Sequence, residues 1–299
     1  MLKKIISIII PTYNEEKNIN LIHNQLINLL KQISEKYDYE IIFVNDGSKD
    51  KSWKEISHIS ENDKKTKGIN FSRNFGHQIA LTAGYNFATG DAVITMDADM
   101  QDTPKLILKM INEWEKGFHI VYARRTNRND GFFKKLTASY FYKILSIVSD
   151  TKIPQNVSDF RLINKKVNNI LKSLKEHDRY LRGLVSWTGF SHTFVNFERP
   201  NRIHGETSYS WKKMFKLALD GIISFTTLPS KIIFLIALFF LIAGAVSIFL
   251  PANKYNLILI LFGVQLTCLW VIAEYAQRIY FQQKQRPLYI IQETINLEN

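Results

Sequence analysis

The sequence predicts an α/β protein in which a parallel sheet comes first and a membrane anchor follows it. Three observations predict this class. Short aliphatic runs alternate with helix-compatible stretches through the first half of the chain. Two long spans near the end carry almost no charge, and polar side chains directly follow three of the aliphatic runs. The alternation is typical of βαβ units, whereas the uncharged spans are typical of helices in lipid.

Composition narrows the class of protein further. The 299 residues are 46% hydrophobic and 22% charged, which predicts an ordered chain with one substantial domain and an addition. A single cysteine, Cys268, excludes an internal disulfide framework and suits a reducing compartment. The excess of 39 Lys and Arg over 27 Asp and Glu suits an anionic partner, which can be a nucleic acid, a phosphorylated small molecule or an acidic membrane surface.

The aliphatic runs predict five buried strands. They cover residues 5–10, 40–45, 68–71, 92–96 and 120–123. Runs such as Ile41–Val44 show no polar alternation, which is typical of parallel strands that helices cover on both faces. In such sheets ligands bind beyond the carboxyl ends of the strands. We therefore expect a nucleotide-binding sheet with its functional residues directly after the strands.

The uncharged spans predict a transmembrane hairpin at residues 231–276. The first span, 232–250, has 19 uncharged residues, or roughly 28 Å of helix at about 1.5 Å per residue. A short polar turn that carries Lys254 separates it from the second span, 256–273. The basic residues that flank the open ends of the hairpin are Lys231, Arg278, Lys284 and Arg286. This bias predicts that both termini are cytoplasmic, while a pair of core helices in a soluble domain is the alternative interpretation.

An amphipathic stretch precedes the hairpin. Apolar residues recur at helical spacing from Trp211 to Ile222, and they predict a helix that lies at the membrane interface or packs on the preceding domain. A similar pattern at 136–148 has the same two interpretations. The predicted organisation is a cytoplasmic domain at 1–205, the interfacial helix at 206–230, the hairpin at 231–276 and a cytoplasmic C-terminal tail at 277–299.

Polar residues follow the first, second and fourth predicted strands. They occupy residues 11–15, 45–48 and 97–102. The chain contains neither G-x-G-x-x-G nor G-x-x-x-x-G-K-[ST], the glycine-rich motifs that hold phosphates. Asp97 and Asp99, with the amide oxygen of Gln101, offer hard oxygen ligands for Mg²⁺ or Mn²⁺, which could bridge a nucleotide diphosphate. An isolated Asp-x-Asp is also typical of a solvated turn or a helix N-cap before Pro104.

Seven motifs resemble, in the same order, those of the family-two glycosyltransferases that act on polyisoprenyl phosphates. The motifs are PTYNEE, VNDGS, SRNFGHQIAL, MDADMQD, SDFRLINKKV, RxxGETSYS and RPLYII. They are similar to those of dolichol-phosphate mannose synthases and, more closely, of bactoprenol glucosyltransferases with a C-terminal hairpin, and they cover nearly the whole chain. The resemblance implies a GT-A fold, a nucleotide-sugar donor, a polyisoprenyl phosphate acceptor, a divalent metal and inversion at the anomeric carbon.

The resemblance also implies roles for individual residues. The residues that would hold the nucleotide sugar are Pro11, Tyr13, Glu15, Val44, Asp46, Asp97, Ala98, Asp99, Gln101, Arg125 and Arg202. Within this set, the metal ligands would be Asp97, Asp99 and Gln101. The residues at the acceptor phosphate would be Arg128, Arg161 and Arg202. By itself the charge run from Arg124 to Arg128 is typical of a solvated face, and Ser208 stands where relatives commonly have Lys.

Asp97, Asp99 and Asp159 are the candidate catalytic residues. A lipid monophosphate has a second pKa of roughly 6, so much of the acceptor is dianionic near neutral pH and hardly needs a general base. Asp159 therefore has two interpretations, which are positioning near the acceptor and a structural role. A carboxylate beside an anionic nucleophile repels it unless Arg161 or the metal intervenes. His77 is interpreted as a structural histidine and stays outside the catalytic set.

The favoured function is transfer of a hexose to a polyprenyl phosphate such as undecaprenyl phosphate, at the cytoplasmic face of the plasma membrane. UDP-glucose is the first choice of donor, followed by UDP-N-acetylhexosamine and GDP-mannose. The alternative from another class is a non-catalytic nucleotide-sugar sensor or scaffold. A processive polysaccharide synthase is disfavoured because no Gln-x-x-Arg-Trp motif occurs. Nucleic acid is not an expected partner, and assembly of several copies stays open.

Overall fold

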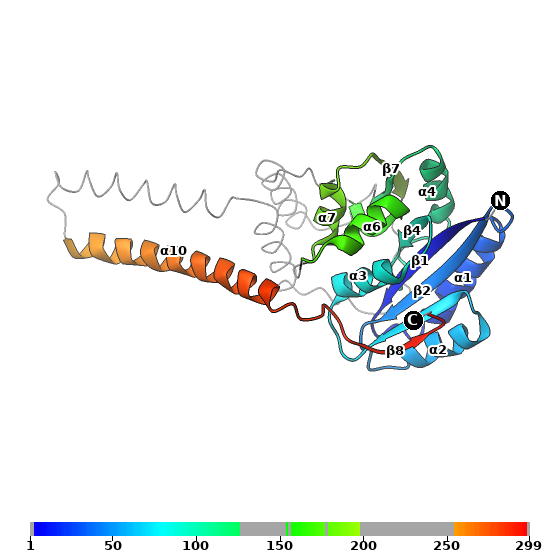
Figure 1. Cartoon of the computed structure of the whole chain (residues 1–299), viewed down its shortest axis with the longest axis horizontal. Coiled ribbons are helices and arrows are strands. Elements are labelled where there is room, and N and C mark those ends of the chain that lie inside the picture. The colour runs from blue at the N-terminus through cyan, green and yellow to red at the C-terminus, as the bar shows by residue number, and fades with distance from the viewer. Residues whose placement is uncertain (1–2, 126–153, 155–156, 177–178, 198–253, 298–299) are drawn as a thin grey trace.

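The computed structural model describes residues 3–125, 154, 157–176, 179–197 and 254–297. Within these residues a sheet of eight strands forms the centre, and one long helix extends away from it (Figure 1). The strands are β1 (Lys4–Thr12), β2 (Tyr37–Asn45), β3 (Thr66–Phe71), β4 (Ala92–Thr95), β5 (Ile120–Arg125), β6 (Val157–Asn164), β7 (His192–Phe197) and β8 (Ile291–Ile295). The helices are α1 (Ile19–Lys31), α2 (Ser52–Asn62), α3 (His77–Phe87), α4 (Leu106–Glu115), α6 (Lys165–Ser173), α7 (Leu181–Trp187) and α10 (Lys254–Gln283).

The strand order in the sheet is β7-β5-β6-β4-β1-β2-β3-β8. Strand β1 lies between β2 and β4 and is parallel to both, and β3 extends the parallel part beyond β2. Strand β6 is antiparallel to β4 and β5, and β8 is antiparallel to β3. The five predicted strands are confirmed as β1 to β5. The expectation of a parallel sheet is correct for its central part alone, because the whole sheet is mixed.

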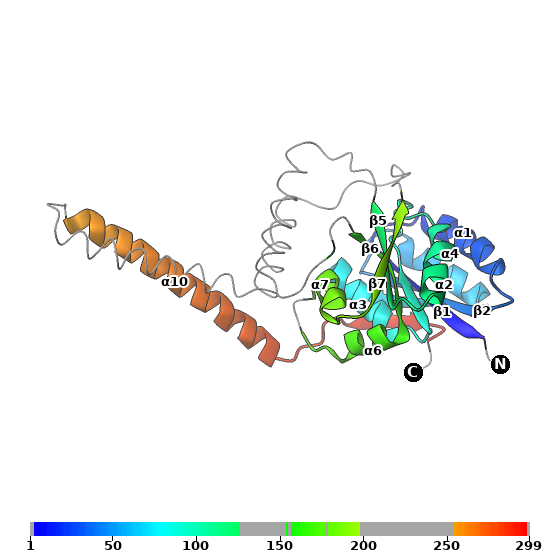
Figure 2. The same cartoon turned by 90° about the horizontal axis from the view of Figure 1, so that it is seen from above.

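Helices cover both faces of the sheet, which explains the continuous aliphatic runs. Figure 2 shows α1, α2 and α4 on one face and α3, α6 and α7 on the other. Successive side chains of a strand point to opposite faces. In β1, Ile8 and Ile10 accordingly pack in the core that includes α1, α2 and α4, while Ile9 packs in the core that includes α3, α6 and α7. All three isoleucines are fully buried.

Strand β6 is absent from the sequence-based prediction for an identifiable reason. Two charged residues, Asp159 and Arg161, interrupt its apolar run, yet both are buried in the structure. They pair with each other across one face of the strand, so their charges do not mark a solvated surface. Because buried charged residues alternate with apolar ones in β6, the strand shows neither a continuous apolar run nor a polar face that a sequence pattern can identify.

Helix α10 contains the second predicted span, 256–273. Its 30 residues correspond to about 45 Å of helix. Several of its large apolar side chains are exposed, including those of Ile258, Trp270 and Ile272. Nevertheless, none of the helices in the described part of the chain combines the length and the apolar character that crossing a membrane requires. The transmembrane hairpin therefore stays a prediction.

The other predictions for this half of the chain fall on residues outside the described ranges. These are the first span at 232–250, the amphipathic helices at 206–230 and 136–148, and the boundary after residue 205. The predicted tail at 277–299 is described in most of its length, and it contains the end of α10 and the strand β8. The sequence does not predict β8, because a strand of five residues pairs here with a segment more than two hundred positions away.

Candidate active site

The polar segments that follow β1, β2 and β4 lie at one edge of the sheet, as predicted. Thr12 pairs in register with Asn45, and the backbone N–H of Asp46 donates to the carbonyl of Thr12 at 2.9 Å. On the other side of β1, the N–H of Met96 donates to the carbonyl of Ile9 at 3.1 Å. The carboxyl ends of three neighbouring parallel strands therefore open onto a shared site.

Hydrogen bonds join the segment after β1 to the segment after β2. The N–H of Asn14 donates to Ser48 Oγ at 2.9 Å, and the N–H of Lys49 donates to Asn14 Oδ1 at 2.8 Å. Asn14 has φ of 56°, a left-handed conformation that asparagine tolerates better than most residues. The N–H of Glu15 donates to Ser52 Oγ at 2.9 Å. These contacts fix the backbone on both sides of Tyr13.

The residues predicted to hold the nucleoside differ in how much of each side chain is accessible. Tyr13 is 39% exposed and presents a ring surface at the strand end. Glu15 is half-buried, and its carboxylate accepts a hydrogen bond from Asn18 Nδ2 at 2.6 Å. Pro11 is buried, and Val44 is fully buried in the core beside α3. Any contact that Val44 makes with a ligand would therefore have to come from its backbone.

The carboxylate of Asp46 is engaged by the loop that follows β3. Its oxygens accept hydrogen bonds from the N–H of Phe75 at 2.7 Å, the N–H of Gly76 at 2.9 Å and Asn74 Nδ2 at 2.9 Å. Burial raises the pKa of Asp46 above its ordinary value, although the two N–H donors oppose this shift by stabilising the charge. The loop at 72–76 thus belongs to the site, and Asp46 holds it in place.

Gly47 allows the close approach of this loop. The residue has φ of 65°, and a Cβ at this position would lie 2.3 Å from the backbone carbon of Arg73. Glycine is therefore the residue type that both the left-handed conformation and the contact require. Asp46 and Gly47 of the VNDGS motif thus both serve to hold the loop at 72–76 against the strand end. This structural role is separate from the nucleotide contact that the resemblance implies for Asp46.

The acidic segment at 97–102 folds as a compact turn. The N–H of Asp97 donates to Asp102 Oδ2 at 3.0 Å, and the N–H of Gln101 donates to Asp99 Oδ1 at 3.1 Å. Met100, between Asp99 and Gln101, has φ of 60°, a left-handed conformation at the centre of the turn. Asp99 is buried, whereas the side chain of Asp97 is 30% exposed. The segment thus forms a turn, but not the solvated turn of the alternative interpretation, because Asp99 and Asp102 are buried. Its partly exposed carboxylate is that of Asp97.

The donor set of this turn fits a divalent cation that a nucleotide shares. In the described ranges, no three His, Cys, Asp or Glu side chains converge closely enough to hold a metal ion by themselves. Mg²⁺, however, is usually bound by one or two carboxylates together with substrate phosphates and water, and all its preferred ligands are oxygens. Asp97 and Asp99 supply two such carboxylates one residue apart.

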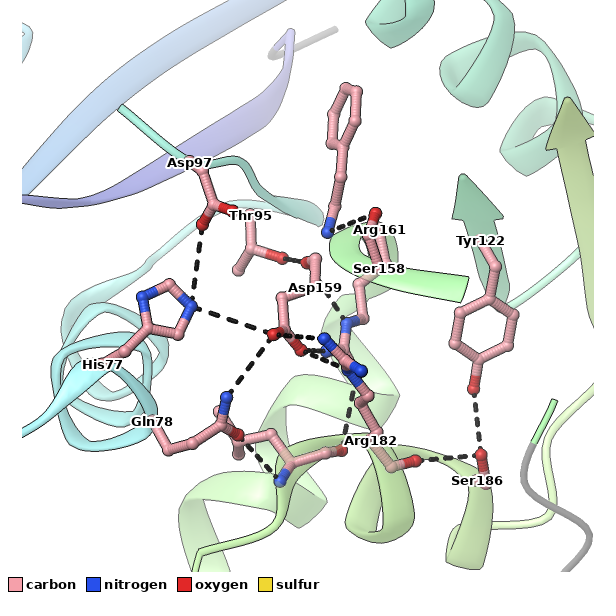
Figure 3. Close-up of polar contacts among 12 residues, drawn as sticks. His77, Gln78, Thr95, Asp97, Tyr122, Ser158, Asp159, Arg161, Arg182 and Ser186 are labelled. Atoms are coloured by element: carbon pink, nitrogen blue, oxygen red, sulfur yellow. Dashed lines mark hydrogen bonds and ion pairs between the residues drawn. The ribbon is translucent and has the colours of Figure 1, made fainter. Parts of the chain in front are cut away.

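Asp159 lies at the centre of a charged cluster beside this turn (Figure 3). Arg182 Nη2 contacts Asp159 Oδ2 at 3.0 Å, and Arg182 Nε donates to Asp159 Oδ1 at 3.1 Å. Arg161 forms a second ion pair with Asp159 Oδ1. Gln78 Nε2 lies 3.5 Å from Asp159 Oδ2. One buried carboxylate thus faces two guanidinium groups and an amide.

His77 joins this cluster to the acidic turn. Its Nε2 lies 3.6 Å from Asp97 Oδ1 and 3.8 Å from Asp159 Oδ2, and Figure 3 shows the ring directed between the two carboxylates. His77 is the first residue of α3, directly after the loop at 72–76. The sequence-based interpretation as a structural histidine does not anticipate this central position.

The ionisation of Asp159 results from two opposing effects. Burial disfavours its charged form, but the positive charges of Arg182 and Arg161 outweigh burial and hold the pKa of the carboxyl well below its ordinary value. Asp159 is therefore ionised at neutral pH. A carboxylate with such a low pKa is a weak base, because general bases work best with a pKa near the operating pH.

The arginines selected from the sequence have different positions. Arg161 is fully buried, and its guanidinium contacts Asp159 and the carbonyl of Leu181. Its predicted contact with the acceptor phosphate stays a prediction. Arg125 ends β5 in register with Phe197. Arg128, Arg202 and the departure at Ser208 lie outside the described residues.

Arg182 and Gln78 complete the cluster, and sequence reasoning does not select either for this site. Arg182 lies on α7 and Gln78 on α3, so two helices approach β6 from the same side. The N–H of Leu181 donates to Gln78 Oε1 at 3.1 Å, which links the two helices. The weak signal in the sequence is Arg182, the charged residue of the otherwise mostly apolar α7. The sequence does not show which carboxylate this arginine contacts, so the signal is ambiguous.

Comparisons with known proteins identify the family of this chain. The model of the family "Glycosyl transferase family 2" matches residues 7–171. An uncharacterized glycosyltransferase of Bacillus subtilis, YkcC, is 44% identical over 98% of this chain and 95% of its own length. A bactoprenol glucosyl transferase of Shigella phage SfV is 37% identical over 96% of this chain and 97% of its own length.

A solved structure has a similar fold. Mannosyl-3-phosphoglycerate synthase from Rubrobacter xylanophilus matches with a TM-score of 0.51 and 14% identity, over 73% of this chain and 71% of that one. This likeness concerns the fold alone, and it supports the GT-A-like mixed α/β sheet that the resemblance implied. With the family model covering more than half of the chain and relatives aligned over nearly all of it, this chain belongs to glycosyl transferase family 2.

Proposed function

We propose that this protein transfers a hexose, with glucose as first choice, from a nucleotide sugar to a polyisoprenyl phosphate and inverts the anomeric carbon. The observation that carries the proposal is the bridge at His77, which brings the acidic turn and the ionised Asp159 to one site. The names of several relatives, bactoprenol glucosyl transferase, support both the sugar and the lipid acceptor at 36–37% identity.

The donor side of the site would lie at the ends of β1, β2 and β4. Tyr13 offers a ring surface for a base, and the loop held by Asp46 borders the same edge. Asp97 and Asp99 would hold a divalent cation, Mg²⁺ or Mn²⁺, with Gln101 as the third predicted ligand. When bound there, the cation would neutralise charge on the departing nucleotide diphosphate.

The acceptor side would lie near Asp159. Because Asp159 is ionised and ion-paired, we assign it to positioning and not to removal of a proton. The pair with Arg182 offsets its repulsion of an anionic nucleophile. The acceptor phosphate is already a dianion in large part near neutral pH, so alignment with the anomeric carbon supplies most of what the reaction needs.

The place of action in this proposal is the cytoplasmic face of the plasma membrane. Supporting this are the uncharged stretch at 232–250, the basic residues that flank the predicted hairpin, and the exposed apolar side chains of α10. Exposed apolar side chains in such number are typical of surfaces that lipid or another protein covers. Flotation of the full chain with liposomes would test this part separately.

One experiment tests the reaction. The full chain in detergent is incubated with Mg²⁺, undecaprenyl phosphate and, in turn, UDP-glucose, UDP-N-acetylglucosamine or GDP-mannose, and the extracted lipid is analysed by mass spectrometry. We expect a lipid product one hexosyl residue heavier with UDP-glucose. Nucleotide binding without a product from any donor would contradict catalysis and favour the sensor or scaffold function.

A further inference from the structure

The C-terminal segment at 289–297 is anchored to strand β3 and helix α2 of the sheet domain. Strand β8 pairs with β3, with Ile291 opposite Phe71. Trp53 Nε1 on α2 donates to Glu293 at 2.9 Å. Asn296 Nδ2 donates to the carbonyl of Thr66 at 2.8 Å. It also donates to the carbonyls of Ser60, in the last turn of α2, and Asp63, directly after that helix. The segment is therefore part of the folded domain, although most of the preceding helix α10 extends away from the sheet (Figure 1).

A row of aromatic rings connects this segment to the loop at 72–76. The ring of Tyr289 stacks on Phe71 with centroids 5.1 Å apart and an interplanar angle of 17°. Phe71 meets Phe75 edge-on at 5.6 Å, and the guanidinium of Arg73 lies 4.0 Å from the centroid of Phe75. Tyr289 OH also accepts a hydrogen bond from Asn86 Nδ2 on α3 at 3.0 Å.

The loop at 72–76 is thus held from two sides. On the side of the site, Asp46 accepts hydrogen bonds from the N–H groups of Phe75 and Gly76. On the other side, the ring of Phe75 rests against Phe71, which Tyr289 covers in turn. The backbone bonds fix where the loop meets Asp46, and the N–H of Ser72 donates to the carbonyl of Ile290 at 3.0 Å. The ring contacts in addition hold the side chain of Phe75, over which the guanidinium of Arg73 lies.

We propose that Tyr289 is a positioning residue for the donor side of the site. By covering Phe71, it holds Phe75 and the loop at 72–76 in the position that Asp46 and a bound nucleotide require. The inference rests on the proposed function, because it assigns the loop to nucleotide binding. It gives a role to the RPLYII motif, which the reaction chemistry does not otherwise use.

The test is Tyr289→Leu in the full chain, with UDP in the presence of Mg²⁺ as the probe. An aromatic stack contributes modestly beyond its burial, so we expect the Kd of UDP and the KM of the UDP-sugar to rise about 3- to 10-fold. The kcat should stay near its wild-type value, because Tyr289 is not placed against any reacting group. Tyr289→Phe keeps the ring and should restore wild-type binding, although it loses the bond to Asn86.

Asn296→Ala is the matched control. It weakens the anchoring of the same segment at the far end of β8, without touching the ring contacts. If Asn296→Ala lowers the melting temperature as much as Tyr289→Leu but leaves the Kd of UDP unchanged, the effect belongs to the ring. An equal rise in Kd for both variants, or unchanged binding in Tyr289→Leu, overturns the inference. Failure of the wild-type chain to bind either UDP or GDP would overturn this inference together with the donor assignment.

Discussion

The charged groups around Asp159 show how single residues set the character of the site. Removing charges from water costs several kcal/mol per ion, and only close pairing with hydrogen bonds offsets that cost. Arg161, Arg182 and Gln78 supply these partners, each from a different element. The resulting carboxylate is fixed in position and ionised at neutral pH, and both properties suit alignment of a substrate better than proton transfer.

The low pKa of Asp159 predicts how the stability of the fold depends on pH. Its folded-state pKa lies below the unfolded value of about 3.9, so its stabilising contribution is fully present above that value and is lost as the pH falls towards the folded pKa. We expect the free energy of unfolding to decrease below about pH 4. Asp159→Asn should flatten this decrease, because it removes the titrating group.

Urea denaturation between pH 2.5 and pH 7 measures this dependence. Asp38→Asn is a useful comparison, because the pKa of Asp38 is also lowered, chiefly by a hydrogen bond from Lys65, but this pair is exposed. Exposed ion pairs contribute little to stability, so Asp38→Asn should change the loss of free energy of unfolding at low pH less than Asp159→Asn does. If both variants lose free energy of unfolding equally between pH 4 and pH 2.5, the buried cluster does not control acid stability.

Asp99 provides a prediction about the reaction itself. Asp99→Asn keeps the size of the side chain and an oxygen that can accept from the N–H of Gln101, but removes the negative charge that a divalent cation needs. We expect transfer to fall at least 100-fold at any Mg²⁺ concentration, with an unchanged melting temperature. The transfer assay with UDP-glucose measures this. Asp38→Asn is the control, because Asp38 lies at the start of β2, whereas the site lies beyond the end of that strand. Wild-type turnover in Asp99→Asn at saturating Mg²⁺ would refute the ligand assignment.

At the scale of elements, the contact between α3 and β1 places His77 at the site. Helix α3 starts at His77, and its small residues let it lie close to the sheet. At Gly84 the helix lies close against β1, because a Cβ there would lie 2.2 Å from Ile9 Cγ2. The backbone of α3 therefore approaches β1 more closely than any other residue at this position would permit.

Gly84→Ala should consequently destabilise the protein despite the better helix propensity of alanine. The gain in propensity is about 1 kcal/mol, whereas overpacking a core typically costs about 1–3 kcal/mol. We expect a net loss of free energy of unfolding and a displaced His77, with reduced transfer activity. In a double-mutant cycle, Ile9→Ala should lessen the cost of Gly84→Ala, because it removes the colliding methyl group. Strict additivity would show that the two residues do not collide.

At the scale of the whole molecule, the last residues of the chain belong to the first domain. Strand β8 covers the edge of β3 that would otherwise be unpaired, and it follows α10, which runs back towards the sheet. An unpaired edge is prone to association with other chains. Removal of everything after residue 230 would therefore affect the sheet as well as the predicted membrane anchor.

A more selective deletion separates these two contributions. Replacing residues 231–284 by a flexible Gly/Ser linker removes the predicted hairpin and keeps the segment that contains β8. We expect the Kd of UDP to stay within about 2-fold of wild type, while transfer to undecaprenyl phosphate in liposomes falls by more than about 10-fold. Truncation after residue 230 should lose both. Equal losses of nucleotide binding in the two variants would show that the replaced region supports the domain and does not present the acceptor.

Sequence patterns were sufficient to predict the elements whose structure depends on residues close together in the chain. Continuous aliphatic runs identified β1 to β5, because parallel strands are buried on both faces. The same reasoning located the acidic turn after β4. It did not reveal that Asp46 is engaged by the loop at 72–76, because this contact depends on which segments meet in space.

By itself, the sequence determined the class of the fold, the edge of the sheet where polar side chains gather and the family to which the motifs belong. The tertiary structure alone decided that His77 bridges Asp97 and Asp159, that Arg182 and Arg161 keep Asp159 ionised, and that β8 closes the sheet beside β3. The physical reason is the range of the interactions. Burial and periodicity are local properties that the sequence pattern records. The contacts of Asp159 with Arg182 and His77 and the pairing of β8 with β3 join residues that lie far apart in the sequence, and the local pattern does not show that they meet.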